Sequence, residues 1–157
     1  MFTGIQPTGN LHIGNYLGSI VNMVKLQDDP SYGQKLLMLA DYHCLTTAMS
    51  YEHSSIKFNE QIGANTLDMA RVLLACGVDP SKMCLFVQSQ VSQHADLTWI
   101  FSCLSPQHWL NTMIQYKEKS HENSSIGLYT YPILMAVDIL LYRASHVPVG
   151  ADQIQHL

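Results

Sequence analysis

A glycine-rich segment near the start of the chain has the residue types of a phosphate-binding loop. Residues 4–18 place four glycines and a proline around His12-Ile13-Gly14-Asn15. Glycine lets backbone approach a ligand without a Cβ in the way, and the N–H groups at the start of a helix attract anions. Apolar residues recur at helical spacing directly afterwards. The sequence therefore predicts a helix start whose amides face a phosphate-bearing ligand.

A second candidate is a single carboxylate in a very apolar stretch. Asp138 lies within residues 131–142, among aliphatic and aromatic side chains. Burying this charge is costly unless donors surround it, so two interpretations stay open: a helix whose one polar face exposes Asp138, or a buried site in which it accepts a hydrogen bond from a ligand. Met135, three residues earlier on the same helical face, could lay its sulfur against a ligand ring.

A third candidate follows a predicted buried strand. His43, with Asp41 two residues before it, comes directly after residues 35–40. Open parallel sheets bind ligands at the carboxyl ends of their strands. His43 is therefore a ligand contact in one interpretation, and a capped surface or core group in the other.

The alternation of predicted strands and helices favours an α/β fold with a Rossmann-like parallel sheet. Strands are predicted at 2–5, 35–40, 83–87 and 146–150. Helices are predicted from 17 to Pro30, from about 54 to 76 with Gly77 as its stop, in two shorter stretches that carry Trp99 and Trp109, and from Pro132 onward. The long helix should turn Phe58, Ile62, Met69, Val72 and Leu73 inward. Both tryptophans are expected in the core or in a subunit contact.

These segments resemble one family over essentially the whole chain, to Leu157. The His12-Ile13-Gly14-Asn15 sequence is similar to the first signature of class I aminoacyl-tRNA synthetases, in the variant that ends in Asn. The opening Phe2–Gly9 and the Tyr131–Tyr142 stretch look like the corresponding segments of tryptophanyl-tRNA synthetases. The resemblance implies activation of tryptophan with ATP to tryptophanyl-adenylate, followed by transfer to tRNA(Trp).

The resemblance also implies roles for individual residues. It assigns ATP binding to Gln6, Pro7, Thr8, His12, Gly14, Asn15, Gly150, Ala151 and Asp152. It assigns the tryptophan pocket to Gly4, His43, Met135, Asp138 and Gln153, with Asp138 accepting the indole N–H. His12, Asn15 and Lys119 are the expected catalytic residues. Mg²⁺ is expected to arrive bound to ATP, without ligands from the protein, and Asp41 is expected to order its loop.

Two of these positions carry an alternative. Ala151 stands where the family usually has Glu, so one polar contact is missing although a backbone contact could survive. Asp152 could simply cap a helix. Lys119 lies in a segment similar to the family's Phe-Lys-Glu-Lys-Ser, but it could equally be a solvated charge, as we expect for Lys117.

The lysine-rich second signature and the anticodon-binding domain of these synthetases do not occur in residues 1–157. The chain is therefore expected to be a partial catalytic domain whose sheet lacks its later strands, with its activity in isolation left open. Three alternatives remain: a tyrosyl-type relative, a nucleotidyltransferase, and an inactive fragment that only dimerises. The resemblance itself implies a homodimer.

Composition excludes several other classes. The 157 residues are 47% hydrophobic and 13% charged, which suits one soluble domain, and no apolar run approaches the roughly 20 residues of a membrane span. A net charge of −4 argues against nucleic-acid binding by the whole surface, so tRNA would need a local patch. The four cysteines show no Cys-x-x-Cys pair or zinc spacing, which predicts neither zinc nor disulfides.

The compartment is expected from resemblance. The segments Leu73–Gly77 and Tyr142–His146 are similar to those of eukaryotic mitochondrial members, which favours the mitochondrial matrix. Met1 falls directly before Phe2, without a transit segment. The cytoplasm is therefore the alternative.

Overall fold

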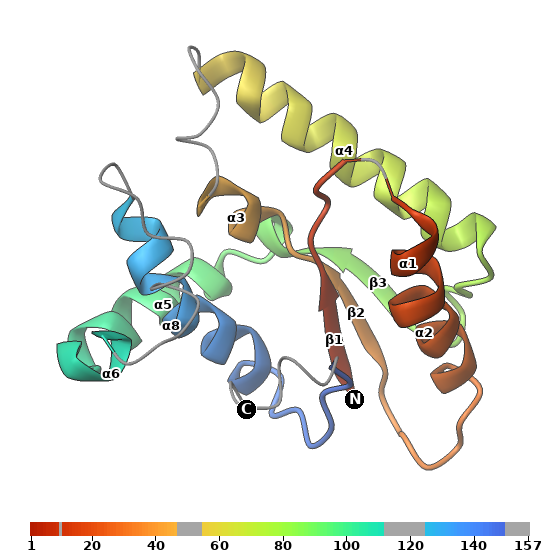
Figure 1. The fold of residues 1–157 in the computed structure, drawn as a ribbon. Helices are drawn as coiled ribbons and strands as arrows, with labels where there is room; N and C mark the ends of the chain where they lie inside the picture. Colours follow the sequence, from red (N-terminus) through yellow and green to blue (C-terminus); the bar gives the residue numbers. More distant parts are fainter. Residues whose placement is uncertain (10, 47–54, 112–124, 150–157) are drawn as a thin grey trace.

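A sheet of three parallel strands lies at the centre of the computed structural model (Figure 1). The structure describes residues 1–9, 11–46, 55–111 and 125–149, with residues 55–59 as backbone only. The strands are β1 (Phe2–Ile5), β2 (Leu36–Leu39) and β3 (Cys84–Val87), and β2 is the middle strand. The α/β, Rossmann-like prediction is confirmed, as are the first three predicted strands.

Helices connect and cover these strands. They are α1 (Ile13–Asn15), the π-helical turn η1 (Tyr16–Ile20), α2 (Val21–Leu26), α3 (Asp41–Cys44), α4 (Ser55–Ala75), the 3-10 turn η3 (Gln88–Gln90), α5 (Gln93–Leu104), α6 (Gln107–Asn111) and α8 (Ile126–Leu140). The first three form one continuous helical segment, because the residues at their junctions keep right-handed helical angles. The predicted helices that begin after the glycine-rich loop and near residue 54 are thus confirmed.

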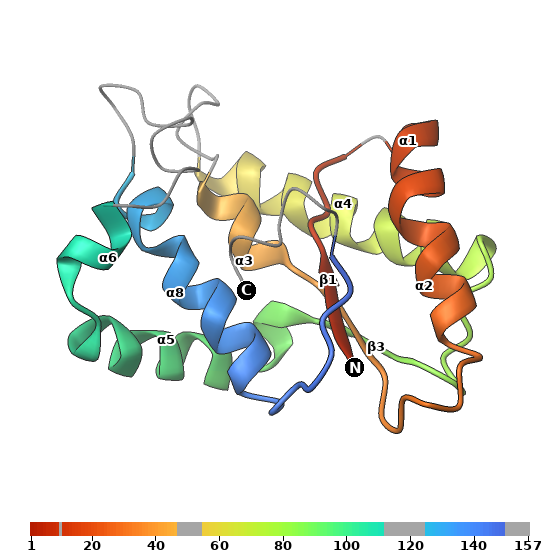
Figure 2. The same ribbon diagram turned by 60° about the horizontal axis from the view of Figure 1, so that its bottom comes forward.

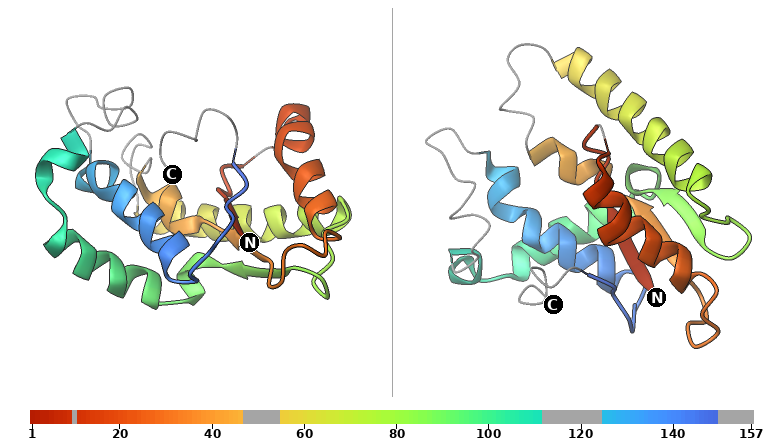
Figure 3. Two further views of the ribbon diagram at one scale, coloured as in Figure 1. Left: turned by 90° about the horizontal axis from the view of Figure 1, so that it is seen from below. Right: turned by 45° about the vertical axis from the view of Figure 1, so that its right-hand side comes forward.

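The two faces of β2 explain why helices pack on both sides of the sheet. Side chains alternate along a strand, so Leu37 and Leu39 join one buried cluster while Leu36 and Met38 join another. The first cluster packs the sheet against α2 and α4, and the second packs it against the end of α8. Figures 2 and 3 show the consequence: α5, α6 and α8 lie to one side of the sheet and α1 and α2 to the other.

The long helix α4 behaves mostly as predicted. Met69 and Leu73 are buried four residues apart, and Gly77 ends the segment at a φ of 105°, a conformation that favours glycine. Val72 is 38% exposed, so its predicted inward orientation is wrong. One residue is about 100° of helix rotation, which moves Val72 away from the Leu73 face. The side chain of Phe58 lies outside the described residues.

Two other predictions need correction. The last helix does not open at Pro132: Ser125 caps it by accepting the Leu128 N–H, so α8 begins six residues earlier and Pro132 lies inside. The missing N–H of proline costs one helical hydrogen bond, which the capped, largely apolar helix tolerates. Residues 146–149 do not form a strand; they run beside β1 with one backbone hydrogen bond, from Phe2 N–H to the His146 carbonyl.

The tryptophans lie on the surface of this chain. Trp99 on α5 is 73% exposed and Trp109 on α6 is 57% exposed, so their placement in the core is wrong. A subunit contact stays a prediction. In the residues that the structure describes, no helix is long and apolar enough to cross a membrane.

Candidate functional site

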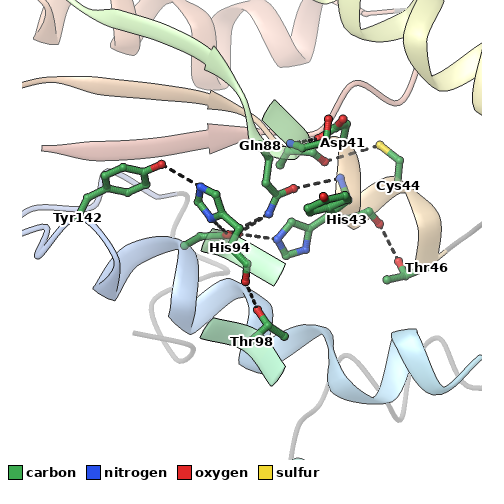
Figure 4. Close-up of polar contacts among 12 residues, drawn as sticks. Asp41, His43, Cys44, Thr46, Gln88, His94, Thr98 and Tyr142 are labelled. Atoms are coloured by element: carbon green, nitrogen blue, oxygen red, sulfur yellow. Dashed lines mark hydrogen bonds and ion pairs between the residues drawn. The ribbon is translucent and has the colours of Figure 1, made fainter. Parts of the chain in front are cut away.

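Polar side chains gather where β2 and β3 end. Parallel strands have their carboxyl ends at one edge of the sheet. At this edge α3 carries His43 after β2, and η3 carries Gln88 after β3. Helix α8 brings Asp138 and helix α5 brings His94 to the same place. Figure 4 shows His43, Gln88 and His94 gathered there from three different elements.

Asp138 is the centre of this cluster. Only 2% of its surface is exposed, so the alternative of a helix face that exposes it is wrong. Its Oδ1 accepts hydrogen bonds from Gln88 Nε2 at 2.9 Å and from His94 Nδ1 at 2.7 Å. Its Oδ2 accepts from His43 Nε2 at 2.8 Å and from Gln88 Nε2 at 3.0 Å. Donors from three elements therefore surround the charge.

The balance of burial and hydrogen bonding sets the charge state of Asp138. Burial acts to raise its pKa, because it penalises the charged form. The hydrogen bonds from His43, His94 and Gln88 and the charge of His43 outweigh burial and hold the pKa of Asp138 below its ordinary value. The carboxylate is thus ionised at neutral pH and acts only as an acceptor.

The donors are themselves held in place. The Gln88 Oε1 accepts the backbone N–H of Tyr42 at 3.0 Å, which turns its amide nitrogen toward Asp138. The hydroxyl of Tyr142 lies 2.9 Å from His94 Nε2. Asp41 accepts the Ser89 N–H at 3.0 Å and so ties α3 to the turn after β3, which fits its predicted role in ordering the loop.

The glycine-rich segment forms a capped helix start. The His12 Nδ1 accepts the Gly14 N–H at 3.1 Å, and the Asn15 Oδ1 accepts the His12 N–H at 3.1 Å. An added Cβ at Gly14 would lie 2.9 Å from His12 Cε1, so glycine is required for the imidazole to lie against the backbone. The predicted helix start is confirmed, and the side chains of its signature satisfy its first amides.

The remaining predicted site residues differ in exposure and in their position relative to the Asp138 cluster. Gln6 and Thr8 are exposed and Pro7 is buried in the turn after β1. Gly4 is exposed on β1, in register with Met38, and Met135 is half-buried one turn before Asp138. In the described part of the chain no hydrogen bond joins the His12 cap to the Asp138 cluster. Lys119, Gly150, Ala151, Asp152 and Gln153 lie outside the described residues.

Sequence reasoning missed three members of the Asp138 cluster. Gln88 follows β3 as Asp41 follows β2, so the rule for strand ends could have found it. Tyr142 follows Asp138 by four residues, just after α8, so helical spacing could have placed it near the carboxylate. His94 lies on α5 without a local signal and reaches the site only through the packing of α5 on α8.

Comparison with known proteins assigns this arrangement to a family. A family model described as tRNA synthetases class I (W and Y) matches residues 1–157. The chain is 49% identical over 160 residues to a tryptophan–tRNA ligase of Prochlorococcus marinus subsp. pastoris, covering 100% of the chain and 44% of that relative. It is 48% identical to the chloroplastic/mitochondrial tryptophan–tRNA ligase of Arabidopsis thaliana, covering 99% of the chain and 36% of the relative.

A solved structure agrees with these relatives. The tryptophanyl-tRNA synthetase of Campylobacter jejuni, in complex with ADP and tryptophan, superposes with a TM-score of 0.84 at 40% identity. The match covers 99% of the present chain and 46% of the Campylobacter chain. The chain therefore spans less than half the length of these proteins.

Proposed function

The chain belongs to the class I tRNA synthetases of the tryptophan and tyrosine group, and from this premise we propose that it serves tryptophan activation with ATP and the charging of tRNA(Trp). The tryptophan carboxylate would attack the α-phosphorus of ATP and expel pyrophosphate, leaving tryptophanyl-adenylate. The terminal ribose of the tRNA would then accept the tryptophanyl group. Such transfers depend mainly on positioning and charge stabilisation.

The observation that carries the tryptophan assignment is the buried, ionised Asp138 at the carboxyl edge of the sheet. An indole ring presents one N–H donor on an otherwise apolar surface, which suits an acceptor-only carboxylate. Met135, on the preceding turn of α8, would contact the ring. We assign His43, Gly4 and Gln153 to the rest of the tryptophan pocket.

The proposed ATP site begins at the capped helix start. Its amides and the His12 and Asn15 side chains would meet the phosphates, and Gly14 would lie under the adenine. Gln6, Pro7 and Thr8 would line the nucleotide from the turn after β1. The assignments of Lys119, Gly150, Ala151 and Asp152 rest on the resemblance alone.

We propose that Mg²⁺ enters bound to the ATP phosphates. Among the described residues, no group of three or more His, Cys, Asp or Glu side chains could hold a metal ion.

The assembly and compartment are further parts of the proposal. Exposed apolar side chains on α5, including Trp99, Ile100 and Leu104, support a homodimer. The relatives named above come from bacteria and from a plant organelle. They agree with a mitochondrial matrix protein of bacterial type, with the cytoplasm as the alternative.

Calorimetric titration of the chain with tryptophan and with tyrosine tests the function. We expect tryptophan alone to bind, and Asp138→Asn to abolish binding. Asp96→Asn changes an exposed carboxylate on α5 and is the matched control. Circular dichroism of each variant separates a lost contact from a lost fold. Selective tyrosine binding would point to the tyrosyl-type relative instead.

A further inference from the structure

The carboxylate of Asp138 has no acceptor position left for a ligand. An ionised carboxylate offers about four acceptor sites. Each oxygen of Asp138 already accepts two hydrogen bonds, from His94 and Gln88 on Oδ1 and from His43 and Gln88 on Oδ2. A ligand N–H can therefore reach Asp138 only if one of these donors moves away.

His94 is the donor with the strongest restraints. It is 0% exposed, and both of its ring nitrogens have a partner, Asp138 on one side and the Tyr142 hydroxyl on the other. Its ring also stacks on Phe86, with 6.2 Å between ring centroids. Figure 4 shows the imidazole directed toward the Tyr142 hydroxyl. Gln88 is equally buried, and the Tyr42 amide holds it in place.

His43 has fewer restraints. It lies on a helix of four residues and keeps slight exposure, while its Nε2 donates to Asp138. In the part of the chain that the structure describes, the second ring nitrogen of His43 makes no hydrogen bond. The His43 ring meets the Tyr131 ring edge-on, with 6.1 Å between the ring centroids. Moving His43 would leave the other donors of Asp138 in place.

We propose that His94 is a positioning residue that fixes Asp138 from the buried side, and that His43 is the donor that the indole N–H replaces on Oδ2. This inference rests on the proposed recognition of tryptophan. Because the carboxylate only accepts, His94 must carry its proton on Nδ1, and neutral imidazole then accepts the Tyr142 O–H on Nε2. The Asp138 carboxylate thereby sets the tautomer, and the Tyr142 hydroxyl, which can donate, satisfies the other ring nitrogen.

Nitrogen-15 NMR of the imidazole rings tests this arrangement without any ligand. We expect the neutral His94 ring to carry its proton on Nδ1 and to keep it there in Tyr142→Phe, because the Asp138 carboxylate remains the acceptor, whereas Asp138→Asn should admit the Nε2–H form. Tyr129→Phe removes a hydroxyl that bonds to the Gln107 carbonyl and to Asn111, neither of which hydrogen-bonds to Asp138 in the described residues, and should leave the tautomer unchanged. A wild-type His94 with its proton on Nε2 would overturn the positioning role, whether or not the chain binds tryptophan.

A second experiment compares the affinities for tryptophan and for β-(benzothiophen-3-yl)alanine, in which sulfur replaces the indole N–H. Wild type should favour tryptophan by about tenfold, the effect of one hydrogen bond to a charged acceptor. His94→Leu should remove this preference, and His94→Asn, which can return an amide donor near Nδ1, should restore part of it. His43→Leu should keep the preference, because Oδ2 is then already vacant.

The ratio separates positioning from general damage to the structure. A merely structural loss in His94→Leu would weaken both ligands equally and leave the ratio at the wild-type value, which would refute the proposal. Loss of the preference in His43→Leu but not in His94→Leu would refute it as well. If wild type bound neither ligand, the proposed function would fail for this chain, and the NMR result would still decide the role of His94.

Discussion

At the scale of single residues, the site depends on keeping one buried charge surrounded by donors. Four hydrogen bonds from three side chains meet Asp138, each between 2.7 and 3.0 Å. A buried charge that lost these donors would be strongly destabilising. The same contacts that stabilise the fold therefore keep the proposed acceptor for the ligand ionised.

The lowered pKa of Asp138 predicts an acid-sensitive part of the stability. The folded state binds the Asp138 proton less tightly than the unfolded chain, whose Asp pKa is about 3.9. This stability is complete above that value and is lost as pH falls through the folded pKa. Asp138→Asn should cost about 1–3 kcal/mol at pH 7 and much less near pH 2, as measured by urea unfolding. Equal losses at both pH values would contradict this, and Asp96→Asn is the control.

The cysteines should differ in reactivity. Burial, followed by the charge of Asp41, raises the pKa of the Cys44 thiol to about 11. At pH 8 roughly one Cys44 thiol in a thousand is then the reactive thiolate. We expect iodoacetamide to modify the exposed Cys84 and Cys103 first, as read by peptide mass spectrometry. In denaturant all should react at similar rates; equal rates in the folded protein would contradict the prediction.

At the scale of secondary-structure elements, the helix start after the glycine-rich loop is capped by its own signature residues. The His12 imidazole lies against Gly14 and occupies an amide that the proposed phosphate would need. ATP binding should therefore displace this cap. The π-helical turn that follows continues the same segment into the buried core through Ile20.

Gly14→Ala should weaken both the helix and ATP binding. The added Cβ would force His12 out of its cap, which costs about 1 kcal/mol, and it would also meet the adenine. Gly18→Ala is the matched control, because nothing lies within 4 Å of its added Cβ. There alanine should stabilise the helix by about 0.5–1 kcal/mol. Thermal unfolding measures whether each substitution stabilises or destabilises the chain, and titration with ATP measures the loss of binding. Destabilisation of equal size in the two variants would refute the cap.

Sequence patterns predict those elements whose signals are local. The buried apolar run of β2, the glycine that ends α4 and the apolar periodicity after the glycine-rich loop each act over a few residues. The sequence pattern puts the start of α8 at Pro132 because proline is a strong local signal for a helix start. The true cap, Ser125, lies outside the apolar pattern. Asp138 and His43 were found by residue type, but His94 was not, since only tertiary packing brings it to the carboxylate.

At the scale of the whole molecule, helix α5 carries one of the exposed apolar surfaces. Helix α5 packs on α8, yet Trp99, Ile100 and Leu104 remain exposed. Exposed apolar patches of this kind commonly mark contacts with other proteins. We therefore place the contact of the predicted homodimer on this surface of α5.

Trp99→Asp should convert a dimer to a monomer, because a charge at the contact would have to lose its hydration. Sedimentation velocity measures the change. Leu67→Asp, on the exposed face of α4, is the control and should leave the dimer intact. A wild-type chain that sediments as a monomer, or a Trp99→Asp variant that stays dimeric, would contradict the prediction.

The Asp138 cluster joins positions that are 95, 50 and 44 residues away along the chain. Closing such long loops costs entropy before the contact is gained, so contacts of this kind form slowly in folding. We expect the cluster to assemble after the rate-limiting step, which means that loss of one of its donors speeds unfolding more than it slows refolding. The binding pocket would then exist only in the completely folded chain. Any ligand that binds there would slow the unfolding of the native state.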